Sequence, residues 1–190
     1  IKDITNKTNY SINRKLVDFI EWFASYNMVS IGLVLKMVIG NSDKFIKKKD
    51  ILEVAKKTKK KFFKLNPEQT DALKFLEKIE KKFDVSVLQG TTGSGKTLVY
   101  FERIKKIIKN KNQALVLLPE IFLTNDFKSR FENFFGFEPA IWHSKISPKQ
   151  KRLIWKGIIS NRIKILVGAR SALLLPFKNL GIIIVDEEHD

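Results

Sequence analysis

The sequence contains no cysteine and only two histidines, His143 and His189. A disulfide framework is therefore excluded, and so is a structural zinc site built from Cys and His ligands. A chain without cysteine suits the reducing cytoplasm. Long hydrophobic runs are also missing: the apolar stretch from Met28 to Ile39 falls short of the about 18 residues that cross a bilayer, and Gly32 and Lys36 interrupt it. We expect a cytoplasmic protein with no zinc and no membrane partner.

Acidic residues are scarce. Only 20 Asp and Glu oppose 36 Lys and Arg, which gives a net charge of +16. Such an excess favours a polyanionic partner such as DNA or RNA, because basic side chains neutralise phosphates and release counterions. A solvated lysine surface explains the same charge equally well, since the chain is rich in Lys, Ile, Asn and Phe together. The charge by itself does not decide between these two interpretations.

Internal repeats and Gly/Ser-rich or Pro-rich linkers are absent as well, so charge and periodicity are left to divide the chain. Residues 1–65 hold 15 basic and 6 acidic residues. An apolar segment at 29–39 offers a packing surface for four residues that share one helical face, namely Leu16, Phe19, Ile20 and Phe23. We predict a small, basic, helical accessory region over residues 1–64.

From Leu65 onward strands and helices are predicted to alternate, which is typical of a parallel α/β sheet. We expect helices over 67–83, with an apolar stripe at Leu73, Leu76, Ile79 and Phe83, and over 96–108, 121–135 and 148–159. The expected strands are 85–89, 114–118, 140–142, 163–167 and 181–185. In the last of these, Ile182 to Val185 form a continuous apolar run, which predicts a central strand buried on both faces.

A complete phosphate-binding motif follows the first predicted strand. The residues Gly90, Thr91, Thr92, Gly93, Ser94, Gly95, Lys96 and Thr97 fit G-x-x-x-x-G-K-[ST] at every position. Glycine lets such a loop aim successive N–H groups at phosphate oxygens, and the following helix N-terminus adds partial positive charge. We expect Lys96 to reach the β- and γ-phosphates of ATP, and the Thr97 hydroxyl to ligate Mg²⁺. The alternative is a glycine-rich turn with an incidental lysine, which the strand–loop–helix setting disfavours.

Acidic residues follow the last predicted strand directly. Asp186 and Glu187 are expected at the carboxyl edge of the sheet, where ligands of open α/β folds bind. Asp186 is predicted to hold Mg²⁺ and Glu187 to orient and deprotonate the attacking water, so Lys96, Asp186 and Glu187 are the candidate catalytic residues. The alternative is an ordinary acidic turn. The predicted fold class is α/β: a RecA-like P-loop NTPase lobe over residues 65–190, with a parallel sheet flanked by helices and preceded by the helical accessory region.

Taken together, these motifs resemble the primosomal protein N′ family, DEAH-like superfamily 2 DNA helicases of bacterial replication restart. The matching segments are Leu88–Thr97 with Val99 and Tyr100, Leu117–Ile121 with Leu123 and Thr124, His143–Ser144, Gly168–Leu173 with Pro176 and Phe177, Asn179–Gly181 and Asp186–Asp190. The resemblance implies ATP and Mg²⁺ as cofactors, and branched or single-stranded DNA, primosome proteins and single-strand-binding proteins as partners. It also implies ATP-driven 3′ to 5′ translocation in primosome assembly.

Several site residues are implied by the resemblance only. Gln69 corresponds to the residue that reads adenine in such motors, and its amide both donates and accepts as an adenine edge requires. Pro119, Glu120, Arg170 and Ser171 correspond to loops that face nucleic acid or couple it to the ATP site. His189 corresponds to the histidine that links the nucleotide site to nucleic-acid contacts. A structural role for each of these residues is the alternative.

The resemblance also sets expectations about what these 190 residues do by themselves. They correspond to the family's first helicase lobe, and the second lobe with its arginine finger, as well as the zinc module, lies outside them. A winged-helix domain is expected near residues 40–65 only in reduced form. We therefore expect no unwinding by the chain alone. The alternative function is a non-catalytic remnant or split-gene fragment that only binds nucleotide or nucleic acid. A GTPase or kinase is disfavoured because no N-K-x-D segment is present.

Overall fold

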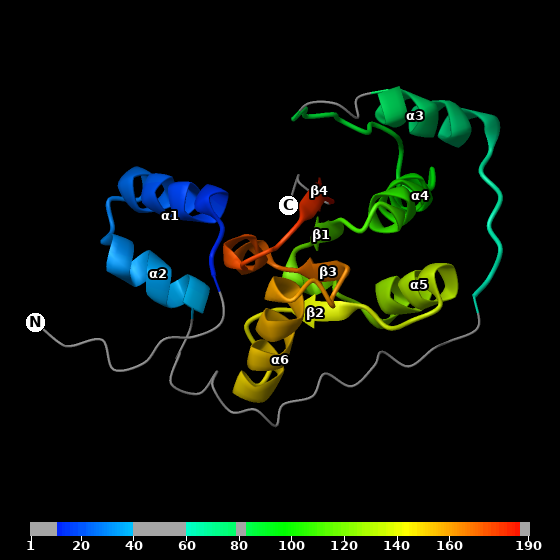
Figure 1. Ribbon diagram of the computed structural model, residues 1–190. Coiled ribbons are helices and arrows are strands. Elements are labelled where there is room, and N and C mark those ends of the chain that lie inside the picture. The colour runs from blue at the N-terminus through cyan, green and yellow to red at the C-terminus, as the bar shows by residue number, and fades with distance from the viewer. Residues whose placement is uncertain (1–10, 40–59, 79–82, 187–190) are drawn as a thin grey trace, which may run out of the picture.

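The computed structural model describes residues 11–39, 60–78 and 83–186 of the chain. Its helices are α1 (Arg14–Tyr26), α2 (Ile31–Ile39), α3 (Pro67–Lys78), α4 (Lys96–Lys109), α5 (Asn125–Phe135) and α6 (Pro148–Ile159), with short 3-10 helices η2 (Glu120–Phe122) and η3 (Arg170–Leu174). Its strands are β1 (Gln113–Leu117), β2 (Ala140–Trp142), β3 (Ile165–Gly168) and β4 (Leu180–Val185). The fold class is α/β, as predicted (Figure 1).

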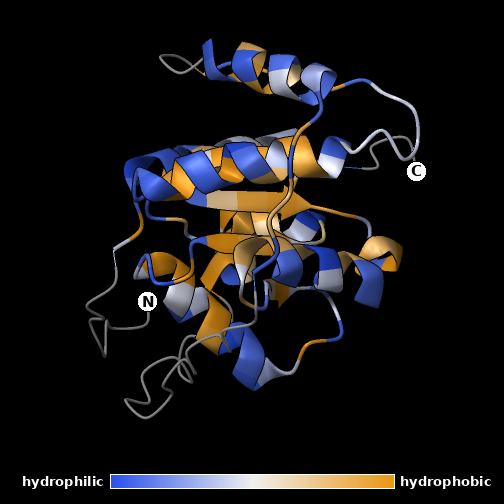
Figure 2. Cartoon of the chain, turned by 90° about the vertical axis from the view of Figure 1, so that its right-hand side faces the viewer, coloured by the Kyte–Doolittle hydropathy of each residue, from blue (hydrophilic) through white to orange (hydrophobic). Residues whose placement is uncertain are grey.

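The strands form one parallel sheet in the order β2-β3-β1-β4, with helices on both faces (Figure 1). Side chains alternate across a strand, so β1 contributes to two cores. Ala114 and Val116 pack toward α4 and α5, whereas Leu115 and Leu117 pack toward α6. Coloured by hydropathy, the sheet is an apolar layer between helices that carry polar residues on their outer sides (Figure 2). This three-layer arrangement is a RecA-like lobe.

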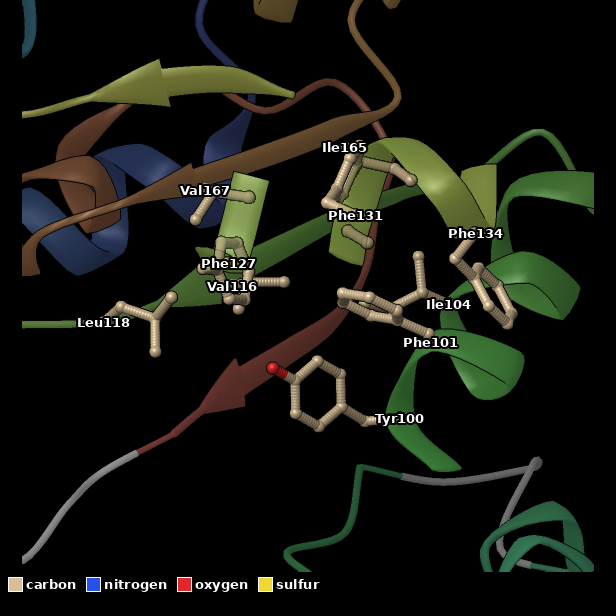
Figure 3. Packing of buried hydrophobic residues seen from close by; sticks show 11 residues of the cluster. Tyr100, Phe101, Ile104, Val116, Leu118, Phe127, Phe131, Phe134, Ile165 and Val167 are labelled. Atoms are coloured by element: carbon tan, nitrogen blue, oxygen red, sulfur yellow. The ribbon is translucent and has the colours of Figure 1, made fainter. Parts of the chain in front are cut away.

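Phenylalanines fill the core between the sheet and helices α4 and α5 (Figure 3). The Phe101 ring lies 5.7 Å from that of Phe131 at 84° and 5.3 Å from that of Phe134, both centroid to centroid. Edge-on packing of this kind favours aromatic pairs beyond the area they bury. The abundance of Phe in this helical layer therefore reflects packing of the core.

Helices α1 and α2 form a third core that continues onto the lobe. Leu16, Ile20 and Val34 are buried there together with Leu174 of η3. Two hydrogen bonds reinforce the contact: the Trp155 indole donates to the Val38 carbonyl over 2.8 Å, and the Asn13 amide donates to the Phe177 carbonyl over 3.1 Å. The predicted N-terminal helices are thus confirmed. Among the described residues, no helix combines the length and apolar character needed to cross a membrane.

The strand predicted at 85–89 is not formed. These residues have irregular backbone, and no ladder joins them to a described strand. Val85 and Val87 are 76% and 88% exposed. A strand requires hydrogen bonds from a neighbour as well as apolar residues, and these hydrogen bonds depend on tertiary placement.

Strand β4 is an edge strand, so the prediction of a central strand buried on both faces is wrong. It pairs with β1 on one side only. Ile182 and Ile184 pack against the core beneath α4, whereas Ile183 and Val185 on the other face are 44% and 57% exposed. The apolar run therefore covers one buried face and one open face.

Two helix boundaries also differ from the predictions. Phe83 lies outside α3, whose described part ends at Lys78, and its side chain is 96% exposed. It therefore does not continue the apolar stripe; Ile79 lies outside the described residues. Helix α5 begins at Asn125 and not at Ile121, because the Thr124 side chain accepts a hydrogen bond from the Phe127 amide and caps the helix.

Candidate nucleotide-binding site

The predicted site residues gather at one edge of the sheet. All strand pairs are parallel, so the carboxyl ends of β1, β2, β3 and β4 meet at this edge. Pro119 and Glu120 follow β1, Arg170 and Ser171 follow β3, and Asp186 follows β4. The sequence predicts that these residues follow strands, and the sheet topology brings the ends of those strands together.

The phosphate loop lies immediately before α4 and has the backbone that its glycines permit. Gly93 and Gly95 have φ values of +82° and +83°, in the left-handed region that residues with a Cβ rarely adopt. The Ser94 amide donates to the Thr91 carbonyl over 3.1 Å, which closes the turn. Lys96 and Thr97 then form the first turn of the 14-residue helix α4. Backbone N–H groups at such a helix start have no partner within the helix and suit an anion.

Lys96 folds back over the loop it follows. Its Nζ donates to the Gly90 carbonyl over 2.6 Å and to the Thr91 carbonyl over 3.2 Å. The ammonium group is thereby held at the concave side of the loop, within reach of a phosphate that the loop amides would bind. These carbonyl contacts are of the kind that a stronger charged acceptor can replace.

Gln69 lies directly against the loop. Its Nε2 donates to the Ser94 carbonyl over 3.0 Å, and its Oε1 accepts from the Asn66 amide over 3.0 Å. The Asn66 side chain in turn accepts from the Gln69 amide over 2.8 Å, so the pair caps the start of α3. A Cβ placed on Gly95 would lie 2.4 Å from Gln69 Nε2 and would displace that side chain, and the φ of +83° disfavours any residue with a Cβ at this position. Contact with an adenine stays a prediction.

Asp186 closes the site from the opposite side. Its amide donates to the Leu117 carbonyl over 3.1 Å, which continues the β1–β4 ladder by one residue. Its Oδ2 accepts a hydrogen bond from the Tyr100 hydroxyl over 2.8 Å. Tyr100 lies on α4 one turn beyond Thr97, so the carboxylate lies against the helix that carries Lys96 and Thr97. Tyr100 therefore connects the carboxylate that follows β4 with the helix that begins at the phosphate loop.

The Tyr100 hydroxyl is a permanent donor in this environment. Burial raises the pKa of Tyr100 far above its usual value, and the Asp186 carboxylate beside it raises the pKa further. The hydroxyl thus stays protonated at any physiological pH.

The oxygen atoms of Thr97 and Asp186 fit a magnesium ion that completes its shell with water and phosphate oxygens. In the described part of the chain, no group of three or more Asp, Glu, His or Cys residues could hold a metal by itself. A hydroxyl and one carboxylate around a nucleotide-bound Mg²⁺ need no such cluster. The donor set therefore agrees with a cation that arrives with its nucleotide.

Two predicted residues cannot be placed. Glu187 and His189 lie outside the described residues. The roles of Glu187 in water activation and of His189 in coupling therefore stay predictions.

Glu120 joins the loops that follow β1 and β2. Its Oε1 accepts from the Ser144 amide over 2.9 Å, and its Oε2 accepts from the Ser144 hydroxyl over 3.0 Å. These hydrogen bonds lower the pKa of Glu120, because they stabilise the ionised carboxylate. Pro119 precedes it as the N-cap of η2. A carboxylate so engaged positions neighbouring loops.

Ser171, in the segment that follows β3, makes a similar link to the end of β2. Its Oγ accepts a hydrogen bond from the Trp142 indole over 3.1 Å, and the Lys151 ammonium lies 6.0 Å from the centre of the Trp142 ring. Arg170 is exposed at the start of η3. The four predicted coupling residues that can be placed thus lie in the segments after β1 and β3, and Arg170 presents a charge to solvent.

Sequence reasoning gave no role to Tyr100, Trp142 or Ser144, although the first and last lie in the motif segments. For Tyr100 a signal existed, since positions 97 and 100 lie one helical turn apart after the phosphate loop. For Trp142 and Ser144 no signal existed, because their partners lie 24 to 29 residues away along the chain.

Comparison with known families agrees with this geometry. The profile of the DEAD/DEAH box helicase family matches residues 66–190, and the chain belongs to this family. Membership implies ATP binding. The replication restart protein PriA of Rickettsia prowazekii is 41% identical over 196 residues, which cover 100% of this chain and 29% of that protein.

Further relatives bear the same name. PriA of Helicobacter pylori strain 26695 is 47% identical over 126 residues, covering 66% of this chain and 20% of the relative. PriA of Bacillus subtilis strain 168 is 45% identical over 106 residues, covering 56% and 13%. The chain spans less than a third of the length of these relatives. The predicted resemblance to replication-restart helicases is confirmed.

Proposed function

We propose that this chain is the ATP-binding lobe of a DNA helicase or translocase that acts in replication restart. The observation that carries the proposal is the 2.8 Å hydrogen bond from Tyr100 to Asp186, because Tyr100 belongs to α4, the helix that begins at the phosphate loop with Lys96 and Thr97. A loop that binds phosphates and a carboxylate that binds a divalent ion are the two requirements of a Mg-ATP site.

Each residue of the site has a distinct task in this proposal. The loop amides and the Lys96 ammonium bind and orient the phosphates, and Thr97 and Asp186 hold the Mg²⁺ that arrives with them. The ion neutralises charge on the phosphate oxygens. Glu187 orients and deprotonates the attacking water, and Gln69 reads the adenine from beside the loop.

Nucleotide binding is tested by calorimetry with ATP and MgCl₂. We expect Lys96→Ala to weaken binding at least tenfold, because the charge at the concave side of the loop is lost. Lys109→Ala is the matched control: it removes a lysine from the far end of the same helix and is expected to leave binding unchanged. Equal affinity of the Lys96→Ala variant and the wild type would refute the site.

DNA is the proposed macromolecular partner, and the loops after β1 and β3 are its proposed contacts. The net charge of +16 and the exposed Arg170 support this assignment. We expect Arg170→Ala to weaken binding of fluorescein-labelled single-stranded DNA and to lower its salt dependence, whereas Arg162→Ala, an exposed arginine ahead of β3, leaves both unchanged. Equal salt slopes for the wild type and Arg170→Ala would contradict the assignment.

Unwinding is not expected from these 190 residues by themselves. Hydrolysis in related motors draws on a cationic side chain from a second lobe, which contributes about 10³ to 10⁵ in rate. The proposal is that ATP binds and is turned over slowly by the isolated chain. ATP-dependent strand separation by the purified chain would overturn this expectation.

The alternative is a non-catalytic fragment that only binds nucleotide or nucleic acid. Intact Lys96, Thr97, Asp186 and Glu187 favour a working site. Single-turnover hydrolysis of radiolabelled ATP, with and without DNA, distinguishes the motor lobe from the non-catalytic fragment. A rate that exceeds the Lys96→Ala background supports the motor lobe, and a rate equal to that background supports the fragment.

A further inference from the structure

Tyr100 connects the helix that follows the phosphate loop with the carboxylate that follows β4. It is 5% exposed, and its ring packs edge-on against Phe101 with centroids 5.2 Å apart. Its hydroxyl donates to Asp186, 86 residues further along the chain. In Figure 3 the Tyr100 oxygen points from α4 toward β4.

Packing alone does not require this hydroxyl. A buried phenol needs a partner, but the neighbouring Phe101, Phe131 and Phe134 show that this core accepts plain phenyl rings. The partner is the carboxylate that follows β4. The phenol thus contacts one of the two residues whose oxygen atoms fit Mg²⁺, and it lies on the same helix as the other, Thr97.

Strand β4, which leads to Asp186, has one open face. Among the described residues it is an edge strand, and Val185, the residue before the carboxylate, is 57% exposed. The hydrogen bond from Tyr100 restricts the orientation of the carboxylate at the end of this strand. Partners that orient a metal ligand affect metal affinity strongly, typically by 10- to 100-fold when they are removed.

We propose that Tyr100 is a positioning residue: its hydroxyl holds the Asp186 carboxylate in the orientation that receives the Mg²⁺ of the nucleotide. This inference rests on the proposed function. In that function the loop amides and Lys96 bind the phosphates, so the contribution of Tyr100 concerns the ion and not the nucleotide itself.

The test is calorimetric titration of ATP into the full chain at several MgCl₂ concentrations and in EDTA, for the wild type and Tyr100→Phe. The substitution removes one oxygen and retains the ring. We expect the Mg²⁺ concentration for half-maximal enhancement of ATP affinity to rise about tenfold. ATP affinity in EDTA should stay within twofold. Tyr26→Phe, which alters a 73% exposed tyrosine, is the control and should match the wild type.

A double-mutant cycle with Asp186→Asn separates positioning from a general loss of packing. If Tyr100 acts through Asp186, Tyr100→Phe has no further effect on Mg²⁺ dependence in the Asp186→Asn background. An unchanged Mg²⁺ dependence in Tyr100→Phe, with or without a lower melting temperature, overturns the inference alone. Absence of Mg²⁺-dependent ATP binding in the wild type overturns the proposed function and the inference with it.

Discussion

At the residue scale, Gln113 holds together the end of the sheet opposite the candidate site. Its side chain is fully buried at the start of β1. Its Nε2 donates to the Ile158 and Ile163 carbonyls over 3.0 and 2.8 Å, and its Oε1 accepts from the Lys178 and Asn179 amides over 2.9 and 3.1 Å. All four hydrogen-bonding positions of the amide are therefore used.

We expect Gln113→Met to lower the free energy of unfolding by about 3 kcal/mol, because buried backbone groups lose their partners while the volume is nearly kept. Urea denaturation followed by circular dichroism measures the change. Gln89→Met, at an exposed position, is the control and should stay within about 0.5 kcal/mol of the wild type. A loss of less than about 1 kcal/mol for Gln113→Met would show that water replaces the amide.

At the element scale, α6 is defined by its first turn. Ser147 accepts from the Gln150 amide over 3.2 Å, and the Gln150 side chain accepts from the Ser147 amide over 3.1 Å. This capping box, with Pro148 in the first turn, fixes where the helix begins. The sequence prediction placed the same helix at the same residues.

We expect Ser147→Ala to destabilise the chain by about 1 kcal/mol, since the Gln150 amide loses its acceptor. Ser147→Asp, which preserves an acceptor at the N-cap, should restore most of this stability. Both are measured by urea denaturation. Equal losses of stability in Ser147→Ala and Ser147→Asp would show that the missing N-cap acceptor does not cause the destabilisation.

The second prediction at this scale concerns the free edge of β4 and the segment 85–89. Both expose apolar side chains, and the segment leads directly into the phosphate loop. Pairing of the segment with that edge would bury these side chains and satisfy backbone groups. We expect amide hydrogen exchange at 85–89 to slow when Mg-ATP is added.

Mass spectrometry of peptides spanning 83–95 measures this exchange. Val87→Lys is expected to reduce the protection gained with Mg-ATP, and Phe62→Lys, at a 98% exposed position away from the loop, serves as the control. Exchange that stays equally fast with and without nucleotide would show that the segment does not join the sheet.

At the scale of the whole molecule, the N-terminal helices and the lobe share a core. Leu174 of η3 is 6% exposed and packs with residues of α1 and α2, whereas the adjacent Leu173 is 36% exposed. We expect Leu174→Ala to cost about 2 to 3 kcal/mol, through lost burial and the cavity left behind. Leu173→Ala is the matched control and should change stability little.

Calorimetry tests whether the two parts unfold together. The wild type should show one transition, because the third core and the bonds from Trp155 and Asn13 join the parts. Leu174→Ala should separate an earlier transition for α1 and α2. Identical thermograms for the Leu173 and Leu174 variants would contradict a shared core.

The sequence by itself determined the features that depend on local chemistry. The phosphate loop, the bounds of α6, the parallel α/β class and the phenylalanine core follow from glycine conformations and hydrophobic period. Four strands were placed to within two residues, because each has apolar residues at the expected spacing.

Only the tertiary structure decided which groups meet. Tyr100 with Asp186, Glu120 with Ser144, and Gln113 with two distant loops are contacts across 24 to 86 residues, which no local pattern specifies. The same holds for β4 as an edge strand and for the unpaired segment 85–89. The apolar pattern of a segment indicates that the segment can form a buried strand. Its neighbours in the fold determine whether it does so, because the hydrogen-bonding partners and covering helices come from elsewhere in the chain.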